Sequence, residues 1–256
     1  MTLKLLFLGS GDSQGVPRWW CDCEVCEEAR STGLNRRARP AVLLSWDGAR
    51  VLLDAPPELR ERLVHHDLRS LDAVFLTHSH NDHVGGIVDL YDFVRWTEAP
   101  LAVRVPAKSH AMLVERYSWL ESRMKLEQLE GPAEFRGTRF TPFEVPHGAN
   151  GFAYAYLIER DGRRLVYMPD SLDVPEALQD ERLGGLDLLV LGTSFWKETG
   201  SRWLRSVLDV QEALAITARV RPARTIFTHL GHGVDRRSPL PQGHEFAYDG
   251  CAVEVE

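Results

Sequence analysis

The sequence predicts a mixed α/β (α+β) fold that occupies residues 1–256 as a single domain. Short apolar runs rich in β-branched and aromatic residues, such as 71–77 and 186–192, indicate buried strands. Segments with the apolar spacing of amphipathic helices, such as 87–96 and 207–220, lie between such runs. Because no stretch has the composition of a flexible linker, we expect one domain.

Taken in chain order, the apolar runs predict strands at 1–9, 41–46, 49–54, 71–77, 101–105, 139–145, 152–158, 164–171, 186–192 and 225–228. Asp47 and Gly48 favour a tight turn, so 41–54 is expected to form a hairpin. Helical spacing predicts helices at 57–68, 87–96, 108–120 and 207–220. The charged segment 121–137 is expected to be a lid or an exposed helix.

Composition and charge exclude several classes of protein. The chain is 44% hydrophobic and 26% charged, as in ordinary soluble globular proteins. A net charge of -7 argues against a nucleic-acid-binding protein, but a phosphate-bearing small-molecule substrate stays compatible. No apolar run approaches the roughly 18 residues of a membrane span, and 1–9 is too short for a signal peptide. Three of the four cysteines crowd into 21–26, so we expect a cytoplasmic protein without a disulfide framework.

Four potential metal ligands follow the buried run 71–77 within six residues, namely His78, His80, Asp82 and His83. Residues two apart on an extended chain point the same way, so His78 and His80 can bind one ion. Asp82 and His83 would lie at the turn into a helix that begins near 84–86 and reach a second ion. Imidazole suits zinc, iron and manganese, and the carboxylate extends the choice to harder ions. The alternative is a solvated His-rich turn without function.

This pattern resembles the HxHxDH signature of the metallo-β-lactamase superfamily. The resemblance implies a four-layer αββα sandwich with two metal ions at one edge, between the sheets. It also implies that the remaining ligands follow as a His, an Asp and a last His. Residues of those types stand at or near the ends of predicted strands, in the order His147, Asp170 and His229.

The resemblance further implies how these residues divide between the ions. One ion would be held by His78, His80 and His147, and the other by Asp82, His83 and His229, with Asp170 between them. Asp54, at the end of the run 49–54, resembles the superfamily's Asp that supports the metal loop through hydrogen bonds. Ala55, Pro56 and Pro57 follow it where the family commonly has a small residue and Gly, which implies a stiffer turn.

A Cys-rich loop of about residues 9–39 predicts a separate zinc site. Cys21, Cys23 and Cys26 leave a tetrahedral zinc one ligand short. His232, three residues after His229, is the preferred fourth ligand, and Cys251 is the alternative. Such a site would clip the N-terminal loop to the C-terminal region and stabilise both. Three free thiols in a loop remain the other interpretation.

The same loop contains a Gly-rich turn at 9–15 and a basic segment with Arg36, Arg37 and Arg39. The turn either presents backbone N–H groups to an anion or only allows the chain to bend tightly. The arginines either meet a phosphate or belong to a solvated loop.

The segment Gly9-x-Gly11-x₂-Gln14-Gly15-Val16-Pro17, followed by the three cysteines, resembles the PhnP family of phosphoribosyl cyclic phosphate phosphodiesterases. That resemblance implies one structural zinc and two catalytic divalent ions, zinc, manganese or iron, with Asp82 and Asp170 as the catalytic carboxylates. It implies hydrolysis of a small or cyclic phosphodiester by a hydroxide that bridges the two ions. A small-molecule substrate, no membrane or nucleic-acid partner, and a homodimer are therefore expected.

The expected proton donor is missing from this pattern. Val207 stands where the PhnP family has the His that protonates the leaving oxygen, and valine cannot donate a proton. Lys197, Glu198 and His244 are weak substitutes, or the leaving group needs no acid. Two other functions stay open: a thioester or lactone hydrolase of the same fold, and a non-catalytic metal-binding protein of a cofactor-biosynthesis pathway.

Overall fold

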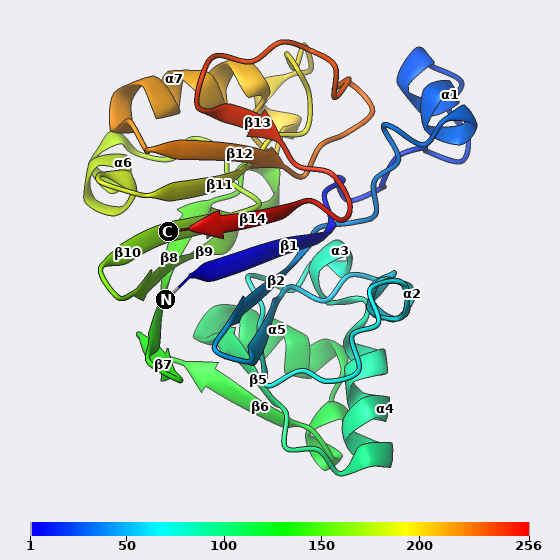
Figure 1. Ribbon diagram of the computed structural model, residues 1–256, viewed down its shortest axis with the longest axis vertical. Helices are drawn as coiled ribbons and strands as arrows, with labels where there is room; N and C mark the ends of the chain where they lie inside the picture. Colours follow the sequence, from blue (N-terminus) through cyan, green and yellow to red (C-terminus); the bar gives the residue numbers. More distant parts are fainter. Residues whose placement is uncertain (1, 256) are drawn as a thin grey trace.

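The computed structural model describes residues 2–255 and contains two seven-stranded sheets that pack face to face (Figure 1). Met1 and Glu256, which belong to the predicted domain bounds, lie outside the described residues. Helices cover the outer face of each sheet, which confirms the expected αββα sandwich. Across the described residues, no helix is long and apolar enough to cross a membrane.

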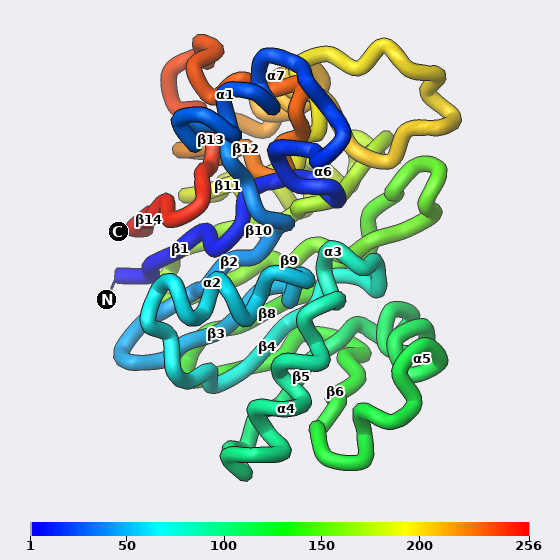
Figure 2. Tube along the Cα trace, turned by 90° about the vertical axis from the view of Figure 1, so that its right-hand side faces the viewer, coloured from blue at the N-terminus to red at the C-terminus, as the bar shows by residue number. Residues whose placement is uncertain are grey.

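The first sheet has the strand order β14-β1-β2-β3-β4-β5-β6. Its strands are β1 (Leu3–Gly9), β2 (Ala41–Trp46), β3 (Ala49–Leu53), β4 (Ala73–Phe75), β5 (Ala102–Pro106), β6 (Lys125–Leu129) and β14 (Ala252–Val255). The same part of the chain contains α1 (Glu24–Ser31), α2 (Leu59–His65), α3 (Asn81–Val84), α4 (Ile87–Thr97), α5 (Ala107–Arg116) and η1 (Leu120–Ser122). β1 and β14 pair antiparallel, so Leu3 lies beside Val255 (Figures 1 and 2).

The second sheet has the strand order β13-β12-β11-β10-β9-β8-β7. Its strands are β7 (Ala133–Phe135), β8 (Thr138–Pro146), β9 (Phe152–Arg160), β10 (Arg163–Met168), β11 (Leu188–Gly192), β12 (Arg224–Thr228) and β13 (His244–Phe246). The helices of this half are η2 (Gly148–Asn150), α6 (Glu176–Leu183), η3 (Arg202–Leu204) and α7 (Val210–Val220).

The central strands are apolar on both faces because both faces are covered. In β10, Leu165 and Tyr167 point between the sheets, whereas Val166 and Met168 belong to the cluster beneath α6 and α7. Between the sheets, Phe75 of β4 stacks on Phe140 of β8 with ring centroids 4.1 Å apart. A strand buried on both sides gives a continuous apolar run, which is the pattern that predicted these strands.

The segment 121–137 is neither a lid nor an exposed helix, and that prediction is wrong. It forms β6 and β7, the edge strands of the two sheets. An edge strand faces solvent on one side and therefore accepts charge. Glu127 of β6, for example, pairs with Arg104 of β5 at 2.8 Å. The helix predicted from 207 begins only at Val210, where Asp209 caps it and Glu212 completes a capping box.

The topology brings the ends of several strands to one edge of the sandwich. β10, β11 and β12 run parallel, and β8 runs in the same direction because both β8 and β10 are antiparallel to β9. The chain therefore delivers His147 after β8, Asp170 after β10 and His229 after β12 to the same edge. The 78–83 segment follows β4 in the facing sheet.

Candidate metal centre

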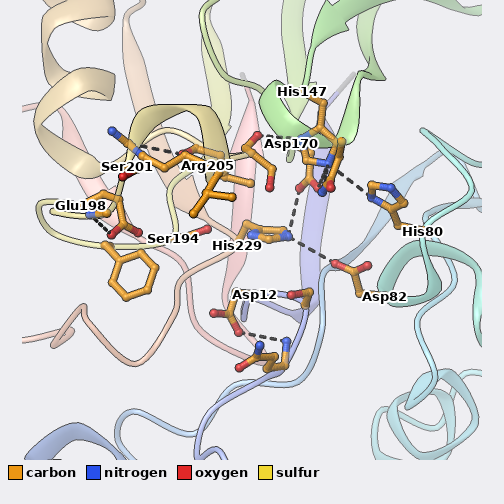
Figure 3. Close-up of a pocket in the computed structure, with 18 of the residues that line it drawn as sticks. Asp12, His80, Asp82, His147, Asp170, Ser194, Glu198, Ser201, Arg205 and His229 are labelled. Atoms are coloured by element: carbon orange, nitrogen blue, oxygen red, sulfur yellow. Dashed lines mark hydrogen bonds and ion pairs between the residues drawn. The ribbon is translucent and has the colours of Figure 1, made fainter.

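Seven buried or half-buried side chains form two adjoining clusters at this edge. Figure 3 shows His80, Asp82, His147, Asp170 and His229 of these clusters. Each cluster contains four side chains whose ligand atoms all lie within 4.8 Å of one another. The first consists of His78, His80, His147 and Asp170, and the second of Asp82, His83, Asp170 and His229. Asp170 belongs to both. The structure thus brings together all seven residues expected from the sequence, in the expected division.

The first cluster is built around three imidazoles. Nε2 of His78 lies 2.9 Å from Nδ1 of His80, which in turn lies 3.3 Å from Nε2 of His147. One carboxylate oxygen of Asp170, Oδ2, lies 3.2 Å from Nε2 of His147 and 3.5 Å from Nε2 of His78. Four donor atoms therefore converge on one point.

The second cluster shares that carboxylate. Oδ1 of Asp170 lies 3.0 Å from Nε2 of His229, and Oδ2 of Asp82 lies 3.4 Å from the same nitrogen. Nε2 of His83 is 3.3 Å from Asp82 and 3.5 Å from Asp170. Asp82 and His83 lie on the single turn of α3, which turns both side chains toward the facing sheet.

These donors fit a pair of divalent cations. Ligands of one tetrahedral ion, each about 2.1 Å from it, lie about 3.4 Å from one another, as the nitrogens and oxygens of each cluster do. Nε2 of His83 is buried and has no hydrogen-bond partner among the described residues. Buried polar atoms normally have partners, and a cation would supply one here.

Asp54 fixes the metal loop from behind. Its carboxylate accepts hydrogen bonds from the backbone N–H and the hydroxyl of Thr77, at 2.8 and 2.9 Å, and from Tyr167 at 3.1 Å. It also accepts Nδ1–H of His83 at 2.8 Å, which leaves Nε2 free to face the cluster. Asp54 is fully buried and adopts a left-handed backbone with φ 62°, despite the two prolines that follow it.

Two further contacts orient ligands. His147 donates from Nδ1 to the carbonyl of Ser206 at 2.7 Å, and Nδ1 of His78 lies 3.0 Å from the Thr77 hydroxyl. Both contacts set the ring tautomer so that Nε2 faces the other donors.

The two clusters differ in their electrostatics. Burial lowers the pKa of His78, His80 and His147, and neighbouring imidazoles lower it further. Burial also lowers the pKa of His83 and His229, but nearby carboxylates outweigh it, raising the pKa of His83 well above its usual value and that of His229 to about 10. The raised pKa values predict that a metal ion entering the second cluster displaces protons.

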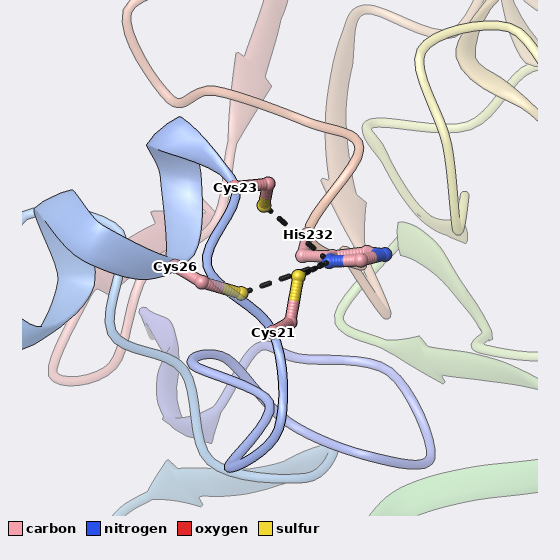
Figure 4. Close-up of side chains that lie close together, drawn as sticks. All are labelled: Cys21, Cys23, Cys26 and His232. Carbon is pink, nitrogen blue, oxygen red and sulfur yellow. Dashed lines mark hydrogen bonds between the residues drawn. The ribbon is translucent and has the colours of Figure 1, made fainter.

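A third cluster joins the Cys-rich loop to the C-terminal half (Figure 4). Nδ1 of His232 lies 3.2 Å from the sulfur of Cys21, 3.5 Å from that of Cys23 and 3.6 Å from that of Cys26. Sulfur and nitrogen ligands of one tetrahedral zinc lie about 3.6 Å apart, so the set fits zinc. Cys251 is buried in the core between the sheets and is not part of the cluster.

The basic segment does not meet the site, and neither of its two expected roles is observed for Arg37. That side chain is buried and donates to the carbonyls of Gly231 and Val234, at 3.1 and 2.9 Å. It therefore fixes the loop that carries His232. In the Gly-rich turn, a Cβ at Gly9 would lie 1.9 Å from the carbonyl oxygen of Arg39, so Gly9 allows the two backbone segments to approach closely, and Gly15 adopts a left-handed φ of 67°.

A cavity of about 420 Å³ opens onto the two metal clusters. It is lined by Asp12, Ser13, Gln14, Arg18, Asn150, Ser194, Phe195, Glu198, Gly200, Ser201, Leu204, Arg205, Ser206 and Val207, besides five of the cluster residues. Sequence reasoning missed most of these residues, because isolated polar residues in loops carry no pattern. The volume suits a small-molecule substrate.

Of the expected proton donors, only Glu198 lines the cavity. His244 lies in β13, where its ring packs against Phe227 and its Nε2 meets the Thr217 hydroxyl at 2.9 Å. That candidate is wrong, because a residue of a sheet strand on the far side of β12 cannot reach the clusters. Lys197 does not line the cavity either.

The fold and the ligand sets define a class of protein. The chain belongs to the beta-lactamase superfamily domain family, whose sequence model matches residues 49–230. This membership confirms the resemblance inferred from the HxHxDH pattern.

Three individual proteins are similar to this chain over nearly all of its residues. A crystal structure described as a new diphosphatase from the PhnP family superimposes with a TM-score of 0.87 at 28% identity, covering 99% of this chain and 97% of that one. Coenzyme PQQ synthesis protein B of Methylobacterium nodulans is 27% identical over 99% of this chain and its own full length. An octanoyltransferase of Porphyromonas gingivalis is 28% identical over 99% of this chain, which spans only 52% of that protein.

Proposed function

We propose that this protein is a metal-dependent hydrolase that cleaves a phosphodiester bond in a small molecule. The observation that carries the proposal is the complete second cluster, in which Asp82, His83 and His229 adjoin the three-histidine cluster through Asp170. The similarity to a PhnP-family diphosphatase supports a related class of substrate. Each phosphorus of a diphosphate diester carries one ester oxygen and one bridging oxygen, so, like the phosphorus of a phosphodiester, it has two substituted oxygens.

Each group of residues has a separate role in the proposed reaction. His78, His80 and His147 would hold one ion, Asp82, His83 and His229 the other, and Asp170 both. Two divalent ions bound there would make water nucleophilic at neutral pH and neutralise charge on the phosphoryl oxygens. Asp54, Thr77 and Ser206 hold the ligand rings in place, and the cavity walls orient the substrate. Cys21, Cys23, Cys26 and His232 would hold a structural zinc.

The test is hydrolysis of bis(p-nitrophenyl) phosphate by zinc- or manganese-loaded protein, compared with panels of thioesters and lactones. Phosphodiester turnover should exceed the others. His80→Ala and Asp82→Ala should each reduce it more than about 100-fold, since removing even a residue behind a ligand costs about 10- to 100-fold. His65→Ala changes an exposed histidine of α2 and is the matched control. Turnover unaffected by the His80 or Asp82 change would reject this site.

A second candidate function is a non-catalytic metal-binding protein, favoured by the similarity to coenzyme PQQ synthesis protein B along its full length. This protein would bind its metal ions and yet turn over none of the three substrate panels. The complete ligand sets favour the hydrolase.

A further inference from the structure

The cavity contains no proton donor beside the metal clusters. Its three histidines all belong to those clusters, and among the described lining residues there is no Lys, Tyr or Cys. Val207 forms the wall next to the first cluster, directly after Ser206, whose carbonyl orients His147. The only other titratable lining residues are Asp12, Arg18, Glu198 and Arg205.

None of these four can protonate an oxygen that leaves from the metal clusters. Arginine does not give up its proton in proteins. Glu198 lies at the opposite end of the cavity from His80 and Asp82, where it accepts the N–H of Gly200 at 2.9 Å (Figure 3). Asp12 is an ion-paired acceptor of hydrogen bonds, with Arg18 at 3.0 Å and the N–H of Gln14 at 3.1 Å.

The absence of an acid restricts the leaving group. An alcohol that leaves as an alkoxide resembles hydroxide, whose conjugate acid water has a pKa of about 15.7, and it needs a proton. A phosphate monoester has its second pKa at about 6 and leaves as a stable anion at neutral pH. General acid catalysis typically supplies about 10²- to 10⁴-fold, so a cavity without an acid favours breaking the second kind of bond.

Arg18 provides a positive charge for such an anion. Its side chain is 15% exposed and pairs through Nη2 with Asp12, while Nε is buried without a hydrogen-bond partner among the described residues. The backbone N–H of Asp12 donates to the carbonyl of Leu230 at 3.3 Å, next to the ligand His229. Asp12 thus fixes the guanidinium on the His229 side of the cavity, and the N–H of Cys21 binds the Arg18 carbonyl at 3.1 Å.

The other arginine that lines the cavity, Arg205, forms ion pairs with two carboxylates. Arg205 pairs with Glu212 at 2.5 Å and lies 3.6 Å from Asp209, both at the start of α7. Two carboxylates therefore neutralise Arg205, whereas Asp12 is the single ion-pair partner of Arg18 within residues 2–255. Arg18 is the lining cation that can accept a further anion.

We infer that the substrate is a diphosphate diester and that Arg18 is the residue that recognises its second phosphate. This inference rests on the proposed function. Water adds its oxygen to one phosphorus, the bond from that phosphorus to the bridging oxygen breaks, and its electron pair stays on that oxygen. The products are two phosphate monoesters, and the protons of water pass to solvent. No oxidant, reductant or further reactant is needed.

The first experiment compares two substrates with the same nucleosides, P1,P2-diadenosine diphosphate and adenylyl-3′,5′-adenosine. The first releases a phosphate monoester and the second an alcohol. The wild-type protein should cleave the diphosphate with a kcat at least about 100-fold higher, the contribution that a general acid would otherwise supply. Equal rates would overturn the inference and leave the proposed function standing.

The second experiment replaces Arg18. Arg18→Met should weaken binding of α,β-methylene adenosine diphosphate, which cannot be cleaved, by roughly 10- to 100-fold, the value of a charge-assisted hydrogen bond. It should raise KM for the diphosphate by a similar factor and lower the preference for it over adenylyl-adenosine. Arg18→Lys should recover part of both losses. Arg69→Ala, in an exposed pair with Asp67, is the matched control.

The remaining outcomes are equally decisive. Circular dichroism and zinc content verify that each variant is folded, and a folded Arg18→Met with unchanged affinity for the methylene analogue would overturn the role of Arg18. A protein that cleaves neither dinucleotide but does cleave bis(p-nitrophenyl) phosphate would overturn the substrate class. Failure on all three substrates would reject the proposed function and this inference together.

Discussion

Replacing Asp54 by Asn tests whether the metal loop depends on the carboxylate behind it. Asp54 accepts four hydrogen bonds, two from Thr77, one from His83 and one from Tyr167, at 2.8 to 3.1 Å. An amide has a single acceptor oxygen, and its NH₂ group would face donors. About two charge-assisted bonds are lost, each worth about 1.5 to 3 kcal/mol, so the free energy of unfolding should fall by about 3 to 6 kcal/mol.

The same change should weaken the second metal cluster. Without the carboxylate, Nδ1–H of His83 faces an amide, and the ring can relieve this by moving its proton to Nε2, the atom that faces Asp82 and Asp170. A protonated nitrogen cannot bind a cation. We expect a loss of about 10- to 100-fold in metal affinity, as is typical for residues that orient a ligand.

The assay combines thermal unfolding of the metal-loaded and chelated protein with a metal titration against a competing chelator. Asp67→Asn is the control, because the side chain of Asp67 is 80% exposed and pairs only with Arg69 among the described residues. If Asp54→Asn matched this control in both stability and affinity, the reasoning from the hydrogen bonds of Asp54 would be refuted.

Three other predictions follow from the clusters. Cys23→Ser should lose one zinc per chain and unfold at a lower temperature while keeping reduced phosphodiester turnover; unchanged zinc content measured by mass spectrometry would contradict it. Loading metal at pH 7 to 8 should release protons, because the pKa of His229 is raised to about 10. The stability that this proton gives the metal-free protein is complete below the usual pKa of about 6.5 and is lost as pH rises through about 10. Calorimetry in buffers of different ionisation enthalpy measures that release, and a zero count would exclude it. Val207→His should speed cleavage of adenylyl-3′,5′-adenosine relative to the diphosphate; an unchanged ratio of rates would show that this wall is too far from the leaving oxygen.

Four of the seven active-site ligands could be predicted from a local sequence pattern, and three could not. His78, His80, Asp82 and His83 could be found because they are contiguous and follow an obvious strand. His147, Asp170 and His229 are single residues at strand ends, and the family resemblance, rather than any periodicity, singled them out. Their convergence depends on the parallel direction of β8, β10 and β12, which a sequence alone does not specify.

Strands that are more polar than a typical buried strand could not be predicted from the sequence. β6 and β7 carry charges at exposed sheet edges, so their apolar alternation is weak. β13 and β14 are too short to give a clear pattern, and no local signal distinguishes His244, which packs in the sheet, from a proton donor. Arg37 is buried because the 231–234 loop folds over it, and no local signal predicts that contact. The inferred role of Arg18 could not be predicted either, because it depends on the position of Arg18 in the wall of the cavity.

The placement of the cysteine cluster determines when metals can enter the protein. Its ligands span positions 21 to 232, and the second active-site cluster is complete only with His229. During synthesis, neither of these two clusters can therefore close before residues 229–232 have left the ribosome, whereas the first active-site cluster needs residues only as far as Asp170. The pairing of β1 with β14 comes later still. Contacts between such distant positions form slowly, and exposed strand edges favour aggregation meanwhile. Metal supply during synthesis should therefore affect the yield of folded protein more than metal added to the finished chain affects its shape.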